Sequence, residues 1–355
     1  MRIAIFIPSL RGGGAERVMV TLANSLAALG HDVDLVLVKA QGPYLVEIGS
    51  EVRIVDLDCG RTLSSLAPLI RYLRQERPNA MLSAMSHINL TAIVARAAAR
   101  SSTRLVVSER NSLQDPRTGG PLRLLMRLLY PRADAIVAVS QGIAKELADE
   151  LGLPPERITA IPNPLDFERI EALSTKRPGH SWFAPGSPPV ILAVGRLERQ
   201  KDYPTLLEAF AQLLNSRNAR LVILGDGSLK AALQQTIDEA GLHDHVLLAG
   251  FQPNPFGWMA ASDLYVLSSR HEGFPNSLVQ AMACGVKVVS TDCPTGPDEI
   301  LEDGRWGGLV PVGDAQALAA AMKDALDGPP RRGNNERLKD FRLNRIVALY
   351  EQLLK

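Results

Sequence analysis

The sequence has few cysteines, no surplus of one charge and no long apolar run, and each absence excludes a class of protein. Its 355 residues include only Cys59, Cys284 and Cys293, without a C-x-x-C pair, so a reduced cytosolic protein is expected rather than a disulfide scaffold. The formal net charge is +1, which gives no basic field for nucleic acid. No apolar segment reaches the ~20 residues of a membrane-spanning helix, so any membrane contact has to be peripheral.

One pattern of apolar runs repeats along the chain. Short, continuously apolar runs, typical of buried parallel strands, alternate with segments of helical periodicity. Strands are expected in the first half at residues 3–7, 33–38, 80–84, 105–108 and 135–139, and in the second half at residues 190–194, 221–224, 246–250, 263–268 and 286–290. The sequence therefore predicts an α/β protein with two doubly wound, Rossmann-like parallel sheets that face each other across a cleft.

Proline and glycine interrupt this pattern near the middle of the chain. Residues 161–165 read I-P-N-P-L, and residues 177–189 are also rich in proline and glycine. Such stretches mark domain boundaries, and we place the hinge at residues 162–166. The predicted domains are residues 1–165, residues 166–335 and a last helix at residues 336–355. Residues 331–335, R-R-G-N-N, are expected to form a solvated polar linker.

A glycine loop, G-G-G at residues 12–14, follows the first strand. It lacks the third glycine of G-x-G-x-x-G, and the second strand ends at Lys39, where an NAD site has an acidic residue, so NAD binding is disfavoured. The glycines would still allow a ligand to approach the backbone closely, with a simple tight turn as the alternative. Other polar residues also fall at predicted strand ends, where parallel sheets bind ligands: His87, Glu109, Arg110 and Ser140.

Residues 268–285 join a strand to a helix and read S-S-R-H-E-G-F-P-N-S-L-V-Q-A-M-A-C-G. The helix is expected to begin near Asn276 or Ser277, because both residue types are strong N-caps. A helix N-terminus presents unsatisfied N–H groups that suit an anion. Glu272 precedes this N-terminus and Gln280 lies one turn inside. Taken alone, the stretch is equally well explained as an ordinary structural corner.

Two segments are both amphipathic and basic, residues 66–77 and residues 121–132. We expect the first to pack on the sheet with a solvated arginine edge. The second carries Arg123 and Arg127 beside four apolar residues. It could bind anionic lipid or an anionic acceptor, or pack like the first, and the sequence leaves both interpretations open.

Together these motifs resemble the retaining glycosyltransferases of GT-B fold, family 4, over nearly the whole chain. The resemblance is carried by E-G-F-P-N at 272–276, Q-A-M-A-C-G at 280–285, V-V-S-T-D-C-P-T-G at 288–296, G-R-L at 195–197 and K-D at 201–202, with support from residues 12–14, 140, 161–164 and 304–314. It implies transfer of a sugar from a nucleotide donor without a metal. It also implies a donor-binding second domain, an acceptor-binding first domain, and a final helix that crosses back to the first.

The physical chemistry of the motifs agrees with that implication. Arg196 and Lys201 would form a cationic clamp for the charge that grows on the departing diphosphate. The resemblance implies that Glu272 contacts the donor sugar and that His87 hydrogen-bonds to it. The second glutamate of the family's E-x7-E pattern, which holds the ribose, is Gln280 in this chain. Its amide can hydrogen-bond a ribose but cannot act as a base.

The sequence thus yields three sets of candidate residues. The catalytic set is Glu272, Arg196, Lys201 and His87. The donor-binding set is Gly13, Gly14, Arg196, Lys201, Phe251, Gly273, Phe274, Pro275, Asn276, Ser277 and Gln280. The acceptor set is Glu109, Arg110, Arg123 and Arg127. No metal and no other cofactor is expected.

The predicted activity is the metal-independent, retaining transfer of a hexose or N-acetylhexosamine from a nucleotide sugar, with UDP as the expected nucleotide. The expected acceptor is a lipid-linked or cell-envelope saccharide at the inner face of the cytoplasmic membrane. The implied front-face mechanism needs no second carboxylate, because the leaving phosphate oxygen takes the acceptor's proton. Two alternatives remain at this point: a sugar-nucleotide epimerase of the same fold, and a non-catalytic sugar-nucleotide-binding subunit, which Gln280 suggests.

Overall fold

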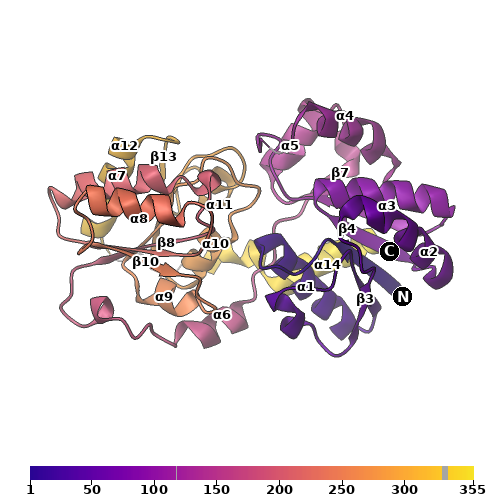
Figure 1. The fold of residues 1–355 in the computed structure, drawn as a ribbon, viewed down its shortest axis with the longest axis horizontal. Coiled ribbons are helices and arrows are strands. Elements are labelled where there is room, and N and C mark those ends of the chain that lie inside the picture. The colour runs from indigo at the N-terminus through magenta and orange to yellow at the C-terminus, as the bar shows by residue number, and fades with distance from the viewer. Residues whose placement is uncertain (117, 330–334) are drawn as a thin grey trace. The chain divides into compact units, whose positions relative to one another are not determined.

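The structure, a computed structural model, describes residues 1–116, 118–329 and 335–355 and divides into two compact units (Figure 1). The N-terminal unit comprises Met1–Pro164 and Leu343–Lys355, and the C-terminal unit comprises Leu165–Arg342. The division falls one residue before the predicted boundary. Of the predicted polar linker, residues 331–334 lie outside the described residues, and Asn335 begins helix α13.

The N-terminal unit is built on a parallel sheet of seven strands in the order β3-β2-β1-β4-β5-β6-β7. The strands are β1 Arg2–Ile7, β2 Asp32–Leu37, β3 Val52–Asp56, β4 Ala80–Ala84, β5 Arg104–Glu109, β6 Ala135–Ala138 and β7 Ile158–Ala160. Its α-helices are α1 Gly14–Ala28, α2 Leu66–Glu76, α3 Ser86–Ala99, α4 Gly120–Leu129, α5 Gln141–Asp149 and α14 Leu343–Leu354. The central strands β1 and β4 are almost wholly buried, as their continuous apolar sequences predict.

The C-terminal unit repeats this plan with six parallel strands in the order β10-β9-β8-β11-β12-β13. The strands are β8 Val190–Val194, β9 Arg220–Leu224, β10 Val246–Gly250, β11 Leu264–Leu267, β12 Lys287–Thr291 and β13 Gly308–Val310. Its α-helices are α6 Phe167–Ser174, α7 Tyr203–Leu214, α8 Lys230–Glu239, α9 Phe256–Ala261, α10 Asn276–Ala283, α11 Pro297–Leu301, α12 Ala315–Asp327 and α13 Asn335–Leu338. The prediction of two doubly wound parallel sheets is confirmed.

Both sheets reverse their strand order at one place. The reversal lies between β1 and β4 in the N-terminal unit and between β8 and β11 in the C-terminal unit. Loops that leave the carboxyl ends of two such strands diverge to opposite faces of the sheet and leave a crevice, which is where open α/β sheets bind ligands. The loops after these four strands are therefore the first place to look for a site.

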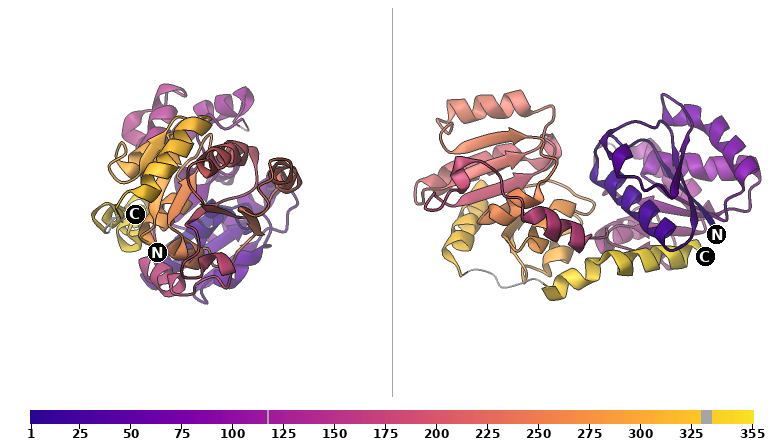
Figure 2. Two further views of the ribbon diagram at one scale, coloured as in Figure 1. Left: turned by 90° about the vertical axis from the view of Figure 1, so that its left-hand side faces the viewer. Right: turned by 90° about the horizontal axis from the view of Figure 1, so that it is seen from below.

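The last helix, α14, belongs to the N-terminal unit. Its residues Ile346, Val347, Tyr350 and Leu354 are part of that unit's core cluster. The Arg104 guanidinium of β5 donates to the Leu353 carbonyl at 2.7 Å, and His31 contacts the Glu351 carboxylate at 3.0 Å. Figure 2 shows α14 running along this unit, with both chain ends close together.

Candidate functional site

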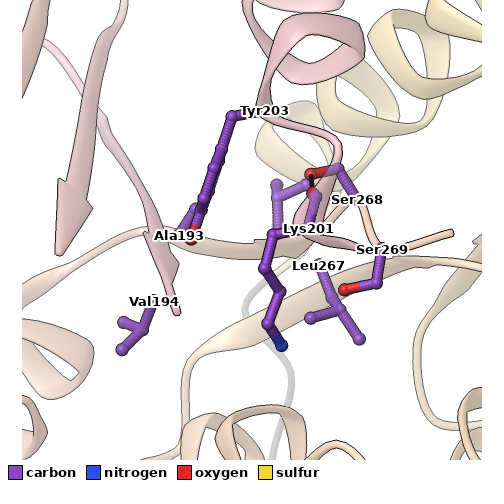
Figure 3. A pocket seen from close by; sticks show the side chains of 8 residues that line it. Ala193, Val194, Lys201, Tyr203, Leu267, Ser268 and Ser269 are labelled. Carbon is purple, nitrogen blue, oxygen red and sulfur yellow. Dashed lines mark hydrogen bonds between the residues drawn. The ribbon is translucent and has the colours of Figure 1, made fainter. Parts of the chain in front are cut away.

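The reversal point of the C-terminal unit brings Lys201 and Glu272 together. The Lys201 ammonium donates to the Glu272 carboxylate with Nζ and Oε1 2.6 Å apart, and the two side chains are 16% and 9% exposed. Ser268, at the end of β11, donates its hydroxyl to the Lys201 carbonyl at 2.7 Å and joins the two loops. Figure 3 shows the extended Lys201 side chain beside Leu267 and Ser269 in the pocket that they line.

Two further residues fix Glu272 in place. The Ser269 hydroxyl donates to Glu272 Oε1 at 2.6 Å, so one carboxylate oxygen has two donors. The Thr295 hydroxyl donates to the Glu272 carbonyl. Thr295 itself has φ +65°, a conformation that is strained for a β-branched residue. Strain held by surrounding structure gathers at functional sites, which supports this loop as one.

Arg196, the second residue of the predicted cationic clamp, differs from Lys201 in its exposure and in its partners. It lies just after β8 and is exposed, and within the described residues its guanidinium has no hydrogen-bond or ion-pair partner. Its loop is positioned by Gly225, whose φ is +145° and where a Cβ would lie 1.9 Å from the Gly195 carbonyl oxygen. Glu272 thus pairs with Lys201, whereas the exposed charge of Arg196 can face an anion.

Helix α10 begins at Asn276, as the sequence predicts, but the predicted cap is wrong. The N-cap is Pro275, and no side chain caps the helix, because the chain is already helical at Asn276. The Ser277 hydroxyl accepts from the Tyr265 hydroxyl at 2.7 Å. Gln280 is half-buried, and within the described residues its side-chain amide makes no hydrogen bond. The α10 N-terminus therefore presents backbone N–H groups, and Gln280 an amide, to a ligand.

The two predicted donor-binding phenylalanines differ in their surroundings. Phe251 follows β10 and is 59% exposed, so its ring is open to a flat partner. Phe274 is buried, and its ring packs edge-on against Phe341 with centroids 5.6 Å apart. The side chain of Phe274 is thus used in packing, and the buried Gly273 beside it contributes only backbone.

The glycine loop of the N-terminal unit is occupied by a side chain of the protein itself. The Gly12 and Gly13 amides donate to Oε2 of Glu16 at 2.8 and 3.0 Å, and Gly14 begins α1. Glu16 is buried and lies at the third helical position, where a carboxylate commonly reaches back to the cap. The Gly13 N–H, which the sequence predicts to bind the nucleotide sugar, therefore already has an acceptor in this structure. Glu16 was not identified from the sequence, although a glutamate two residues after the last glycine of the loop was its signal.

The carboxyl end of β4 delivers His87 through strained backbone. Met85 has φ +84°, a conformation that side-chain-bearing residues rarely adopt, and it immediately precedes α3. His87 lies in the first turn of α3 and is exposed. The structure thus places His87 at the reversal point of its own sheet, where its prediction as a sugar contact remains untested.

Glu109 and Arg110 are buried in protein, which corrects their prediction as residues that face the acceptor. The Glu109 carboxylate accepts from the Tyr130 hydroxyl at 2.7 Å, and burial raises its pKa above the ordinary value. The Arg110 guanidinium donates to Asn163 Oδ1 at 2.8 Å and to the Tyr350 hydroxyl at 3.2 Å. A residue's position at a strand end does not fix the direction of its side chain, and these two turn inward. Ser140 is likewise structural, because it caps α5.

Helix α4 exposes apolar side chains. It packs inward through Met126, so Leu124, Leu125 and Leu128 are exposed at 57%, 47% and 56%, with Arg127 exposed beside them. In the part of the chain that the structure describes, no helix is long and apolar enough to cross a membrane.

Arg123 of α4 holds a loop in this structure, and its predicted contact with the acceptor stays a prediction. It donates to the carbonyls of Leu113 and Thr118 and pairs with Glu150 at 2.9 Å. These contacts tie the loop before α4 to the helix itself and to the end of α5.

Comparison with known proteins adds to this geometry. Residues 188–328 match the family "Glycosyl transferases group 1", and residues 12–169 match "Glycosyltransferase Family 4". The chain is 31% identical to the Campylobacter jejuni N-acetylgalactosamine-N,N'-diacetylbacillosaminyl-diphospho-undecaprenol 4-alpha-N-acetylgalactosaminyltransferase, over 92% of this chain and 90% of that one. It is 29% identical to the Rhizobium meliloti lipopolysaccharide core biosynthesis glycosyltransferase LpsE, over 97% and 96%.

A solved structure shows the same fold. The crystal structure of Anabaena HepE in complex with UDP superposes with a TM-score of 0.80 at 22% identity, over 100% of this chain and 99% of that one. At that identity the likeness concerns the fold, and it assigns both parallel-sheet units to one known architecture.

Proposed function

The chain belongs to family 4 of the GT-B glycosyltransferases, and from that membership we propose that it transfers a hexose or N-acetylhexosamine from a UDP-sugar to a lipid-linked or envelope saccharide with retention of configuration. The observation that carries the proposal is the pairing of Lys201 with Glu272 at the reversal point of the C-terminal sheet, where the loop after β8 also carries the exposed Arg196. The acceptor class is supported by the names of the relatives, which act on undecaprenol-linked saccharide and on lipopolysaccharide core.

In the proposed reaction the bond between the sugar's anomeric carbon and the β-phosphate oxygen breaks first. Negative charge then grows on the diphosphate, and Arg196 and Lys201 stabilise it, in the role that a divalent cation has in metal-dependent transferases. The acceptor hydroxyl bonds to the anomeric carbon from the same face. Its proton passes to the leaving phosphate oxygen, so no protein base is required.

The other candidate residues hold the donor in this scheme. Glu272 accepts hydrogen bonds from the donor sugar's hydroxyls with the oxygen that Ser269 and Lys201 leave free. Gln280 hydrogen-bonds the ribose, and Phe251 stacks on the uracil with its exposed ring. The predicted hydrogen bond between His87 and the donor sugar is kept as part of the proposal.

We further propose that α4 lies on an anionic membrane surface, where the lipid-linked acceptor is found. Three exposed leucines beside an exposed Arg127 combine apolar area with a positive charge, which suits the boundary between headgroups and acyl chains. The protein would then act at the cytoplasmic face as a peripheral enzyme.

A nucleotide panel followed by a transfer assay tests the proposed function. UDP, GDP, ADP and CMP with their sugars are compared by thermal shift, because a ligand at 100 times its dissociation constant stabilises the fold by about 2.7 kcal/mol. The UDP series is expected to give the largest shift. The best donor is then incubated with a polyprenyl-diphosphate saccharide and the products are identified. Isomerisation of the donor alone would instead indicate an epimerase, and binding without any turnover would indicate a non-catalytic subunit.

A further inference from the structure

The two segments that connect the units are hydrogen-bonded to each other. The chain leaves the N-terminal unit between Pro164 and Leu165 and returns between Arg342 and Leu343. The Leu165 amide donates to the Phe341 carbonyl at 2.6 Å, and Leu165 pairs in parallel with Arg342 through an isolated bridge. We call Leu165 and residues 341–342 the paired crossing. Because both connections meet there, a change at this pair acts on both at once.

Phe341 connects the paired crossing to the loop that carries Glu272. Its side chain is 1% exposed, and its ring contacts the ring of Phe274 with centroids 5.6 Å apart and planes inclined at 65°. Phe274 lies two residues after Glu272. Packed aromatic rings occupy discrete arrangements, so a displacement of Phe274 has to be accommodated at Phe341.

Arg337 links the same phenylalanine to the second loop of the site. Its guanidinium lies over the Phe341 ring, 4.5 Å from the centroid, and donates to the Glu299 and Ile300 carbonyls of α11 at 2.8 and 3.1 Å. Helix α11 begins two residues after Thr295, whose hydroxyl donates to the Glu272 carbonyl. Phe341 and Arg337 therefore contact the continuations of both segments that position Glu272.

The N-terminal unit fixes the other ends of the two connections with one side chain. Arg110 donates to Asn163, two residues before the crossing, and to Tyr350 on α14. Both connections are thus anchored on either side of the crossing, and the short span between the anchors is the part that can respond.

From this geometry we propose that Phe341 is a positioning residue. When a nucleoside diphosphate binds at the Glu272 loop, Phe341 passes the resulting displacement of Phe274 on to the paired crossing. The proposal rests on the proposed function for the identity of the ligand. Coupling of this kind between two sites usually amounts to a factor of about 5 to 150 in an equilibrium constant.

Hydrogen exchange of the full-length protein with and without UDP tests the coupling. The Leu165 amide is the reporter, because its acceptor is the backbone oxygen of Phe341 and a side-chain substitution leaves that acceptor in place. UDP is expected to slow exchange in the peptide that contains Leu165 about fivefold or more in the wild type. In Phe341→Leu this slowing should disappear, while the UDP dissociation constant from calorimetry stays within about threefold of the wild-type value.

Matched variants separate coupling from simple loss of packing. Phe210→Leu makes the same change in the core under α7, a cluster that contains neither Phe274 nor Phe341, and should keep the response to UDP. Phe341→Met also removes the ring, but its long flexible side chain fills irregular gaps, so it serves if the leucine variant does not fold. In steady-state assays the Phe341 variants should lower kcat with little change in the donor KM.

Two results would overturn the proposal while leaving the proposed function intact. One is that UDP slows hydrogen exchange in residues 268–280 of the wild type but does not change exchange at Leu165. The other is a Phe341 variant that retains the full response at Leu165. If no nucleotide of the panel slows exchange in residues 268–280, the coupling and the proposed donor site are both wrong.

Discussion

Replacing Glu272 by Gln should destabilise the protein and at the same time make its stability respond more strongly to UDP. The substitution keeps the size of the side chain but removes the charge that faces Lys201 at 2.6 Å. Removing one partner of a buried ion pair costs about 3–5 kcal/mol, because the other charge is left uncompensated. Lys201 retains 16% exposure, so we expect the lower end, about 3 kcal/mol. For a unit of this size that corresponds to a fall in Tm of about 6–12 °C.

The response to UDP follows from the same charge. A diphosphate at Lys201 replaces the missing carboxylate, so saturating UDP should recover more of the Tm in Glu272→Gln than it adds to the wild type. Turnover with the UDP-sugar should nevertheless fall about 100-fold or more, since the sugar has lost its charged acceptor. Differential scanning calorimetry with and without UDP, alongside initial rates, gives all three quantities.

A surface ion pair supplies the control. Asp226 and Lys230 lie 3.3 Å apart with half-exposed side chains, and such pairs contribute about 0–1 kcal/mol. Asp226→Asn should therefore shift Tm by less than about 4 °C. If Glu272→Gln changed Tm no more than this control, the Lys201 pair would contribute no more to the free energy of unfolding than a surface pair does. An unchanged rate would remove Glu272 from the reaction.

Three further substitutions test other parts of the molecule. Arg196→Ala should lower kcat about 100- to 1,000-fold with little change in Tm, because the residue is exposed and its charge acts on the leaving group; normal kinetics would refute the clamp. Glu109→Gln should flatten the pH dependence of stability. Burial raises the pKa of Glu109, so the folded state binds more protons and the free energy of unfolding falls as pH rises between the unfolded and folded pKa; a slope retained in urea titrations of the variant would contradict this. Leu124→Ser with Arg127→Gln should weaken binding to phosphatidylglycerol vesicles at low salt by about fivefold or more, whereas Leu63→Ser, at a still more exposed apolar site elsewhere in the unit, should leave it unchanged.

The parts of the fold that the sequence predicts are those with the strongest local signals. Strand β4 was predicted at residues 80–84 because a fully buried strand is a continuous apolar run. Strands β3, β7 and β13 were missed. They lie at or near the edges of their sheets, β7 and β13 have three residues each, and their partial exposure leaves no continuous run to detect.

The candidate site was predictable in its members but not in its contacts. Lys201 and Glu272 follow strands that flank the reversal point, and strand order alone brings their loops together. Their pairing, and the hydroxyl of Ser269 that shares the same oxygen, depend on side-chain directions that no motif encodes. The positions of Glu109 and Arg110 at the end of a strand were predictable in the same way. The direction of their side chains, which turn into the protein, was not.

The place of α14 has a consequence for synthesis of the protein. Because Tyr350 and Ile346 belong to the core built on β1, the C-terminal unit is topologically an insertion into the N-terminal one. The half that leaves the ribosome first is therefore completed last, after the final residues have emerged. Until then its core lacks α14, while the inserted unit already has its whole sequence available to fold.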